Sequence, residues 1–468
     1  MGLGEIFEFF RQHARKSATL ADLPRNFSKK KLKNRIRKKR KGSGMSQSSG
    51  ATTTDLYAAG FRSPLISKFN IVRARNSEAD PSQFPAPRSG HRMFVTPDYI
   101  YLLGGYSSAP ETRHKTFTDV WRFNLVNDLW EQCKISKGSI PETLASFSLI
   151  QTDNYNEAYV FGGTGVPFGA RASDKLYKIN VTNSGDFVLE EEKVVGDEKD
   201  KPPRMYGQGM IYRRHLDSDY VTETIYLMGG TTGHEYNMDV WKLECITPRR
   251  NLDECDIYHA KEWKSTCLTY RNMEPQDGRY RLEAVLHQNL LISFGGGAPD
   301  FCADFEQLLC FDVQKEKFVK VPTIPDDVHG FPGARKCHAM IEFGNDVYII
   351  GGCCDLQNSE VNREIYEDVW KIDLNTMQWT KLPARLPSPV YFHSASVTIE
   401  GCVHVFGGCT DIASKRRTNQ LQAMWLKPPT LLHLSMKTVL NRLSDEEASK
   451  EITMRRPMPL IRKVLYSL

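Results

Sequence analysis

The segment ARKCHAMIEFGNDVYIIGGC, residues 334–353, sets the pattern of this chain, and EDVWKIDLNTMQWTKLP, residues 367–383, completes it. The first segment predicts two short apolar strands, the second of which ends in the doublet Gly351-Gly352. Trp370 and Trp379 fall in two further strands. Four short strands separated by turn signals indicate one antiparallel sheet. A sheet of this size cannot cover both of its faces, so it requires neighbours of its own kind.

Copies of this pattern recur along the chain. Each ends an apolar strand in a glycine doublet, and an aromatic or bulky residue and then a second aromatic residue follow, as in Trp121 and Trp130. The doublets are Gly104-Gly105, Gly162-Gly163, Gly229-Gly230, Gly295-Gly296, Gly351-Gly352 and Gly407-Gly408. Because the spacing is regular, the repeats predict a ring of similar sheets and not a set of separate domains.

The repeat resembles the kelch motif, which implies an all-β fold, a six-bladed kelch β-propeller, here over residues 68–427. Glycine lets the chain turn sharply where strands crowd around the central channel. The last repeat lacks an outer strand of its own. The lone predicted strand KFNIVRA, residues 68–74, is expected to supply that strand, with Phe69 in the aromatic position, and so to close the ring.

Composition sets limits on the class of protein. The chain has no run of 18 apolar residues, so no membrane-spanning helix is expected. At the N-terminus Glu5 and Glu8 precede the basic residues, which is the reverse of a secretory signal. The eleven cysteines include no Cys-x-x-Cys pair, which favours free thiols over a metal site. We therefore expect no cofactor, a reducing compartment, and a cytoplasmic or nuclear location.

Charge is unevenly distributed. The chain carries a net charge of +6, but residues 1–50 contain 14 Lys and Arg against three Asp and Glu, so the remainder is mildly acidic. Residues 1–67 are expected to form a basic, mostly disordered tail and linker. The run KKKLKNRIRKKRK, residues 29–41, is compatible with a nuclear import signal, a tether to nucleic acid or acidic membrane, or a solvated tail. No aromatic residue interleaves it, so only nonspecific contact with nucleic acid is expected.

A candidate binding site follows from strand direction. In an antiparallel sheet the residues that lead into the first strand share a rim with those that follow the doublet at the end of the second. These positions are rich in cationic and aromatic side chains, which suit an anionic ligand because guanidinium groups bind carboxylate or phosphate with paired hydrogen bonds. The alternative is that each arginine caps turn carbonyls or pairs with a nearby aspartate. The candidates are Arg88, Tyr106, Arg204, Tyr206, Arg279, Tyr280, Arg281, Arg335, His338 and Tyr391.

No catalytic arrangement is visible in the sequence. It contains no nucleophile elbow, no His/Glu pair at metal-binding spacing and no Walker loop. We therefore expect a binding protein and not an enzyme. Long polar insertions are predicted to be loops that carry specificity, at 106–118, 212–222, 245–262 and 353–367.

The character of the chain changes after Pro428-Pro429, and residues 428–468 show helical spacing of apolar residues. Thr430 is expected to be the N-cap of the first helix. The segment resembles the box with which substrate receptors bind elongin C, with Ser435 where that box usually has Cys. The matching residues are Thr430, Leu431, Leu434, Ser435 and Val439. Downstream, Pro457, Leu460 and Ile461 resemble a cullin-2 box, with Arg456 where an apolar residue is usual.

Together the repeats and this segment resemble the kelch-domain-containing substrate receptors of cullin-2 ubiquitin ligases. The resemblance implies elongin B/C and cullin-2 as partners, and glycine-ended C-terminal tails of other proteins as ligands. It also implies arginines that hold the terminal carboxylate, for which Arg279, Arg281 and Arg204 are available, with Tyr206, Tyr280 and His338 on the peptide backbone. The alternative is a kelch scaffold that binds actin or a signalling enzyme and packs its C-terminal helix on itself.

Overall fold

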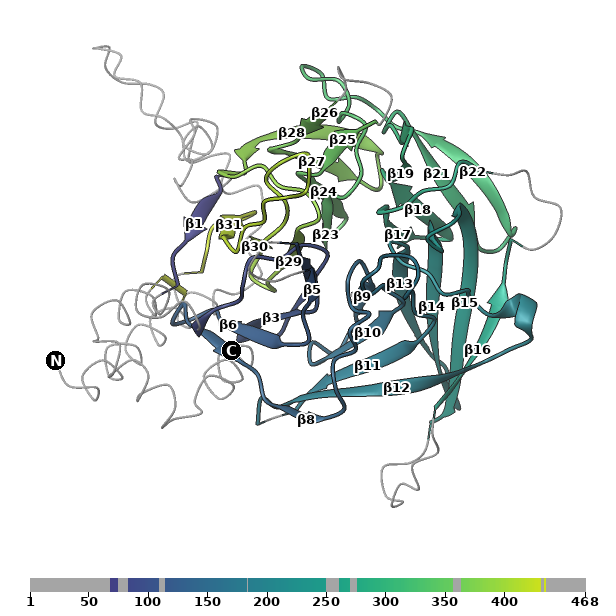
Figure 1. Cartoon of the computed structure of the whole chain (residues 1–468). Helices are drawn as coiled ribbons and strands as arrows, with labels where there is room; N and C mark the ends of the chain where they lie inside the picture. The colour runs from purple at the N-terminus through teal and green to yellow at the C-terminus, as the bar shows by residue number, and fades with distance from the viewer. Residues whose placement is uncertain are drawn as a thin grey trace, which may run out of the picture. The chain divides into compact units, whose positions relative to one another are not determined.

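A computed structural model describes residues 68–74, 83–108, 114–182, 184–249, 261–269, 276–356, 363–430 and 433–434 (Figure 1). The chain divides into two units, Met1–Phe61 and Arg62–Leu468, and all described residues belong to the second. Within them the fold is all-β, as predicted, with a short 3-10 turn η2 (Glu198–Asp200) and a helical start at 433–434. The described residues contain no helix long and apolar enough to cross a membrane.

Four sheets have four antiparallel strands each. The first consists of β2 (Arg92–Val95), β3 (Tyr99–Leu103), β6 (Val120–Asn124) and β7 (Trp130–Gln132). The second consists of β17 (Glu283–His287), β18 (Leu290–Phe294), β21 (Gln307–Asp312) and β22 (Lys317–Pro322). The third consists of β23 (Ala339–Phe343), β24 (Asp346–Ile350), β27 (Asp368–Asp373) and β28 (Gln378–Arg385). The fourth has the order β1-β31-β30-β29, from β29 (Ser394–Val397), β30 (Cys402–Phe406), β31 (Leu421–Trp425) and β1 (Asn70–Val72).

A larger sheet joins two more four-stranded units. One unit consists of β9 (Ser148–Gln151), β10 (Glu157–Phe161), β11 (Leu176–Val181) and β12 (Phe187–Val195). The other consists of β13 (Gly209–Leu216), β14 (Tyr220–Thr231), β15 (Tyr236–Pro248) and β16 (Glu262–Cys267). Their outer strands β12 and β16 pair in parallel, and β8 (Ile135–Lys137) also pairs with β12. Two neighbouring repeats are therefore hydrogen-bonded along their outer edges.

The prediction of a loop at 212–222 is wrong. Residues 209–216 and 220–231 form a long hairpin in which Leu216 pairs with Val221, and β15 extends through Pro248 beside it. A hairpin that projects beyond the body of its sheet is solvated on both faces, so its strands can carry polar residues throughout. Polar composition alone therefore did not distinguish this hairpin from a loop.

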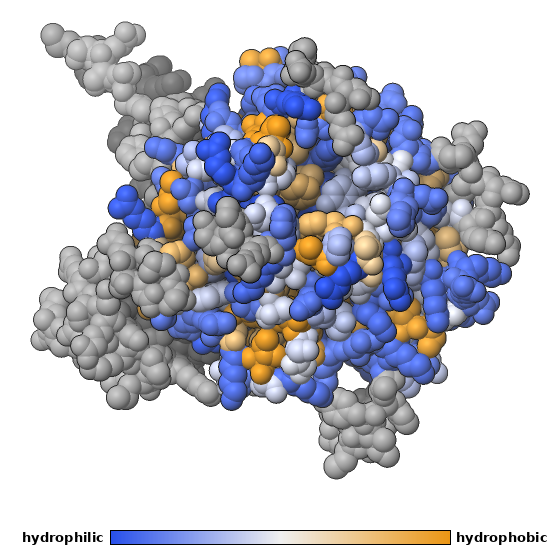
Figure 2. All heavy atoms as spheres, in the orientation of Figure 1, coloured by the Kyte–Doolittle hydropathy of each residue, from blue (hydrophilic) through white to orange (hydrophobic). Residues whose placement is uncertain are grey.

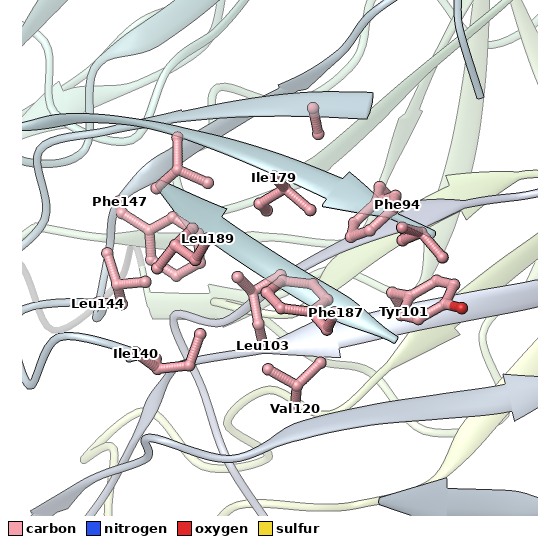
Figure 3. Packing of buried hydrophobic residues seen from close by; sticks show 13 residues of the cluster. Phe94, Tyr101, Leu103, Val120, Ile140, Leu144, Phe147, Ile179, Phe187 and Leu189 are labelled. Carbon is pink, nitrogen blue, oxygen red and sulfur yellow. The ribbon is translucent and has the colours of Figure 1, made fainter. Parts of the chain in front are cut away.

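The innermost strands of the units contact one another in a closed cycle: β2, β9, β13, β17, β23, β29 and back to β2. Figure 1 shows most of them around one centre. The apolar core lies between successive units. In the cluster of Figure 3, for example, Phe94 and Val120 of the first sheet pack with Phe147, Ile179 and Phe187 of the next. The molecule is thus a propeller-like ring of repeated sheets.

The ring is closed by both ends of the folded segment. β1 pairs antiparallel with β31, in register Asn70 with Ala423 and Val72 with Leu421. Phe69 is buried in the core cluster of the last two sheets. The prediction that the N-terminal strand completes the last repeat is confirmed. No other strand is needed to cover the outer edge of β31.

The glycine doublets occupy backbone conformations that side chains disfavour. Gly351 and Gly352, for example, have φ values of 59° and 94°. A Cβ atom on Gly352 would come within 2.7 Å of the Cβ atom of His338. The doublet therefore needs glycine both for its turn and for the close approach of the next strand. Beyond three doublets the chain forms small hairpins: β4 (Tyr106–Ser107) with β5 (Lys115–Thr116), β19 (Gly297–Ala298) with β20 (Phe301–Cys302), and β25 (Cys353–Asp355) with β26 (Arg363–Ile365).

Candidate binding site at the rim of the ring

The rim predicted from strand direction is present. The residues that lead into the innermost strands form isolated bridges with the residues that follow the doublets, as in Ser89 with Tyr106 and Tyr280 with Gly297. The equivalent pairs in the other repeats are Ala145 with Thr164, Tyr206 with Thr231, Lys336 with Cys353 and Tyr391 with Cys409. The two sets of candidate residues therefore lie at one end of the ring, here called the mouth.

A closed circle of backbone hydrogen bonds, here called the backbone ring, narrows the mouth. Its members are Gly90, Ser146, Gly207, Arg281, Cys337 and Phe392. The N–H of each donates to the carbonyl of its neighbour over 2.7 to 3.3 Å, and all six have φ between 55° and 70°. Two members are glycine, but the other four are held in the left-handed region, which L-residues occupy only when their surroundings impose it.

An ion pair crosses the channel next to the backbone ring. Arg92, the first residue of β2, places its Nη1 2.7 Å from Oε1 of Glu283, the first residue of β17. In the cycle of innermost strands β2 and β17 lie opposite each other. Arg92 Nε also donates to the carbonyl of Phe147 at 3.1 Å. The pair therefore obstructs the channel directly beneath the mouth.

Arg281 extends across the backbone ring. Its Nη2 donates to Oγ of Ser146 at 2.7 Å, and its guanidinium carbon lies 5.1 Å from the ring centroid of Phe392. Its Nε is buried and makes no hydrogen bond. Ser146 also lies 3.2 Å from the hydroxyl of Tyr280. Sequence reasoning missed Ser146, which lies 16 residues before Gly162, whereas Arg281 lies 14 residues before Gly295.

Arg88 and Arg335 are not available to a ligand. Arg88 is fully buried and makes two hydrogen bonds to Asp119, at 2.7 and 3.0 Å, and one to the carbonyl of Gly104. Arg335 repeats this arrangement with Asp368 at 2.6 and 3.3 Å. Both guanidiniums also lie about 4 Å from an aromatic centroid. The alternative interpretation, an arginine paired with a nearby aspartate, is correct for these two residues.

These pairs perturb the carboxylates as expected. Burial alone would raise the pKa of Asp119, but the hydrogen bonds and charge of Arg88 outweigh it and hold that pKa below its ordinary value. The same opposition holds for Asp368: burial raises its pKa, but the charge and hydrogen bonds of Arg335 outweigh burial and hold the pKa below its ordinary value. Both pairs are therefore ionised structural supports of their repeats.

Arg279 occupies the same position in its repeat but has no such partner. It stands two residues before Arg281, as Arg88 and Arg335 stand two before their backbone-ring residues. Gln307, the first residue of β21, takes the place of the aspartate. Arg279 is 9% exposed, its Nη1 donates to Oγ of Ser293 at 3.3 Å, and its Nε makes no hydrogen bond.

The charge of Arg279 is weakly compensated. Among the described residues no carboxylate lies within ion-pair distance of it. Burial lowers the pKa of Arg279, and the more distant Asp304 and Asp277 oppose this shift. Arginine nevertheless stays protonated throughout the physiological range. A buried guanidinium with unused donors can bind an anion.

Aromatic side chains flank the two arginines. Tyr206, Tyr236 and Phe392 each lie 5.6 to 6.4 Å from the ring of Tyr280, measured between centroids. Burial, together with the neighbouring Tyr280 and Tyr236, raises the pKa of Tyr206 to about 12. The hydroxyl of Tyr206 therefore remains protonated and can donate to a ligand carbonyl. Figure 2 shows patches of hydrophobic surface near the centre of this view, surrounded by hydrophilic surface.

His338 is buried beneath the rim. It follows the backbone-ring residue Cys337, as His91 and His393 follow theirs, and it is buried against Gly352. Nε2 of His91 and of His393 donates to a carbonyl of the adjacent unit at 3.1 Å, and Gln208 makes the same bond. Burial, reinforced by Arg335, lowers the pKa of His338 far below its ordinary value, so the ring is neutral. His91, His393 and Gln208 thus link adjacent units, whereas neither ring nitrogen of the buried His338 makes a hydrogen bond to a described residue.

The remaining candidates on the mouth differ in accessibility. The hydroxyl of Tyr391 is buried and donates to the carbonyl of Asp411 at 2.8 Å, so Tyr391 is structural. The hydroxyl of Tyr106 lies 2.5 Å from Nδ1 of His114, and its ring stacks under Arg417. Arg204 is exposed and stays a candidate. The candidates that remain are therefore the buried Arg279 and Arg281, the half-buried Tyr206 and Tyr280, and the exposed Arg204.

The start of the C-terminal segment is described. Oγ1 of Thr430 accepts a hydrogen bond from the N–H of His433 at 3.2 Å, and the N–H of Leu434 donates to the carbonyl of Thr430. This confirms Thr430 as the N-cap. Leu434 is exposed, and the imidazole of His433 packs on Trp425. The other predicted residues of this segment lie outside the described residues: Leu431, Ser435, Val439, Pro457, Leu460 and Ile461.

Comparisons with known proteins agree with this architecture. Residues 90–352 match the family described as KLHDC2/KLHL20/DRC7 Kelch-repeats domain, and residues 334–384 match the Kelch motif. The chain is 32% identical to Kelch domain-containing protein 10 of Homo sapiens over 386 residues, which cover 81% of this chain and 79% of that protein. It is 30% identical to the Kelch domain-containing protein 10 homolog of Drosophila melanogaster, in an alignment that covers 75% of this chain and 57% of that protein. It is 22% identical to Kelch domain-containing protein 2 of Bos taurus.

Proposed function

Because this chain belongs to the kelch-repeat family that includes Kelch domain-containing protein 10, we propose that it is a non-catalytic substrate receptor. It serves a cullin-2/elongin B/C E3 ubiquitin ligase in the cytoplasm or nucleus, and its mouth binds glycine-ended C-terminal tails of other proteins. The propeller has six blades, which the cycle of six innermost strands supports. Residues 428–468 form the helical elongin- and cullin-binding segment.

The observation that carries the proposal is Arg279. Two other repeats place an arginine at this position and neutralise it with an aspartate, whereas this repeat has Gln307. A buried cation without a partner is unfavourable unless a ligand supplies the missing charge. A terminal carboxylate has the same shape and charge as the aspartate side chain that Arg88 and Arg335 bind. The site is therefore complete only when a carboxylate occupies it.

The closed floor of the mouth favours a chain terminus over an internal segment. The backbone ring and the pair of Arg92 with Glu283 obstruct the channel, so a peptide cannot pass through. A terminus needs no exit. Arg281 crosses the ring close to Gly90 and so leaves little room for a side chain at the terminal position. Glycine is the residue that fits this restriction, and Tyr206 and Tyr280 then donate to the backbone of the tail.

The test is calorimetry with a glycine-ended peptide as free acid and as C-terminal amide. The amide removes only the charge, so its affinity should fall tenfold or more, since charge-assisted hydrogen bonds contribute about 1.5 to 3 kcal/mol each. Arg279→Ala should cause a similar loss with the free acid and little further loss with the amide. Lys317→Ala, on the outer strand of the same repeat, is the matched control. Equal affinity for acid and amide would contradict the carboxylate site.

The ligase assignment has a separate test. Leu431 is the central apolar residue of the elongin-like box, and a buried leucine can contribute a few kcal/mol at an interface. Leu431→Asp should abolish co-purification of elongin B/C and cullin-2 while peptide binding at the mouth persists. Val328→Asp makes the same chemical change at a fully exposed site and should have no effect. Retention of elongin by Leu431→Asp would favour the alternative, a kelch scaffold for actin or a signalling enzyme.

A further inference from the structure

A second concave site lies where the last sheet meets the first. It is a cavity of about 480 Å³, and its lining includes Ser107, Ser388, Thr410, Lys415, Arg416 and Arg417. The lining contains three cationic side chains and no acidic one. Hydroxyl groups and cations together are the donors that bind oxyanions. Arg279 does not line this cavity, and the function proposed above was argued without it.

The cations of the cavity have no carboxylate partner among the described residues. Arg417 makes hydrogen bonds to neutral groups: its Nε donates to Oγ of Ser89 at 2.8 Å, and its Nη1 donates to Oγ of Ser108 and to the carbonyl of Ser414. The nearby Asp411 uses its two carboxylate oxygens to accept the backbone N–H groups of Lys415 and Arg416. The long side chains of those two residues are exposed. The cavity therefore keeps an excess of positive charge.

The cavity adjoins the mouth. Arg417 contacts Ser89, which directly precedes Gly90 of the backbone ring. The guanidinium carbon of Arg417 also lies 4.8 Å from the ring centroid of Tyr106, a residue of the rim. A peptide whose terminus is held in the closed mouth must leave over the rim. One route out of the mouth therefore passes over Arg417 and its two basic neighbours.

We propose that this cavity binds an oxyanion on a side chain of the same substrate tail, a few residues before its terminus. The ligand group is the carboxylate of Asp or Glu or the phosphate of a phosphorylated Ser. This inference rests on the proposed function, because the mouth fixes the terminus from which the distance is counted. The cavity thus makes the receptor select tails by charge as well as by their last residue.

Fluorescence anisotropy with short labelled glycine-ended peptides tests this. One neutral peptide is compared with variants that carry Glu or phosphoserine at successive positions before the terminus. One or two adjacent positions should bind about threefold to tenfold more tightly, and phosphoserine should exceed Glu because it carries more charge. The gain should disappear in Lys415→Gln/Arg416→Gln, with affinity for the neutral peptide unchanged. Lys317→Gln/Lys320→Gln removes the same charge from an outer strand and should keep the gain.

The outcomes separate the two proposals. If acidic, phosphorylated and neutral tails bind equally while the free acid still exceeds the amide, the cavity proposal is overturned and the proposed function stands. A gain that survives Lys415→Gln/Arg416→Gln, or that is equal at every position, also overturns it, since it would reflect overall charge. If acid and amide bind equally but the gain depends on Lys415 and Arg416, the cavity binds oxyanions and the terminal-carboxylate function fails. Comparing Glu with phosphoserine identifies the source of the anion.

Discussion

The repeats built on β2 and β23 differ from the repeat built on β17 by one missing carboxylate. In the first two, Arg88 and Arg335 are neutralised within their own repeat by Asp119 and Asp368. In the third, Arg279 has the same place in the repeat, but Gln307 stands at the position of the aspartate. The shared scaffold shows what the arginine does when it is structural. The difference then marks the repeat whose arginine has no carboxylate partner among the described residues.

The repeat built on β13 gives the reverse case. It has an aspartate, Asp239, at the position of Asp119, but Met205 where the arginine would be. Burial raises the pKa of Asp239, and its carboxylate accepts a hydrogen bond from Thr269 at 3.2 Å. Without the arginine the pKa shift changes sign relative to Asp119. Arginine and aspartate are thus separable parts of this repeat.

The largest effect should come from breaking a complete pair. Asp368→Ala leaves the fully buried Arg335 without its anion and should lower the free energy of unfolding by about 3 to 5 kcal/mol. Arg279→Met removes a cation that has no partner, so stability should stay equal or rise. Denaturant unfolding of both variants measures this. A similar loss of stability in both would mean that Arg279 is also structural, and the contrast between the repeats would disappear.

The next effect should come from completing the incomplete repeat. Gln307→Asp supplies the carboxylate that Asp368 provides elsewhere, and it should compete with the tail for Arg279. Affinity for a glycine-ended peptide should fall tenfold or more, which corresponds to about 1.4 kcal/mol, while the thermal midpoint rises. Gln307→Asn has the size of the Gln307→Asp variant without its charge, and it should bind the peptide like the natural protein. Undiminished binding by Gln307→Asp would place the carboxylate of the tail elsewhere.

The smallest effect concerns His393, whose ring makes a hydrogen bond to the adjacent unit. Burial lowers the pKa of His393 to about 3, against about 6.5 in the unfolded chain. The unfolded state therefore binds more protons below pH 6.5, and stability falls as the pH falls from 6.5 toward 3. His393→Gln copies Gln208 and should remove about 1 kcal/mol of the loss between pH 6.5 and 5.5. Unfolding curves at both pH values test this, and an unchanged slope would contradict a neutral buried His393.

Much of the fold could be predicted because it depends on short-range sequence patterns. The doublets, the spaced aromatics and the KFNIVRA strand each lie within one repeat or at one end. The shared rim followed from antiparallel geometry alone. The parallel pairing of β12 with β16 could not be predicted in this way, because pairing between the outer strands of two repeats gives no local pattern in the sequence.

The site was predicted only in part, because the role of an arginine depends on a residue about 30 positions away. Arg88 and Arg279 look alike locally, and only Asp119 or Gln307 distinguishes them. Aligning the repeats on the aromatic or bulky residue that follows each doublet places Gln307 at the position of Asp119 and Asp368, and so would have found this difference. Ser146 was missed for a related reason, since its partner Arg281 comes from a unit that is not adjacent in the ring.

The pairing of β1 with β31 also bears on how the protein is made. β1 leaves the ribosome first, and its partner follows roughly 350 residues later, which at typical translation rates is a delay of roughly 20 to 70 seconds. Throughout that time Phe69 and the edge of β1 have no native partner. The circle cannot close until almost the whole folded segment has been synthesised. Chains that stop before Leu421 therefore keep an open sheet edge, which is a template for pairing with other chains and so for aggregation.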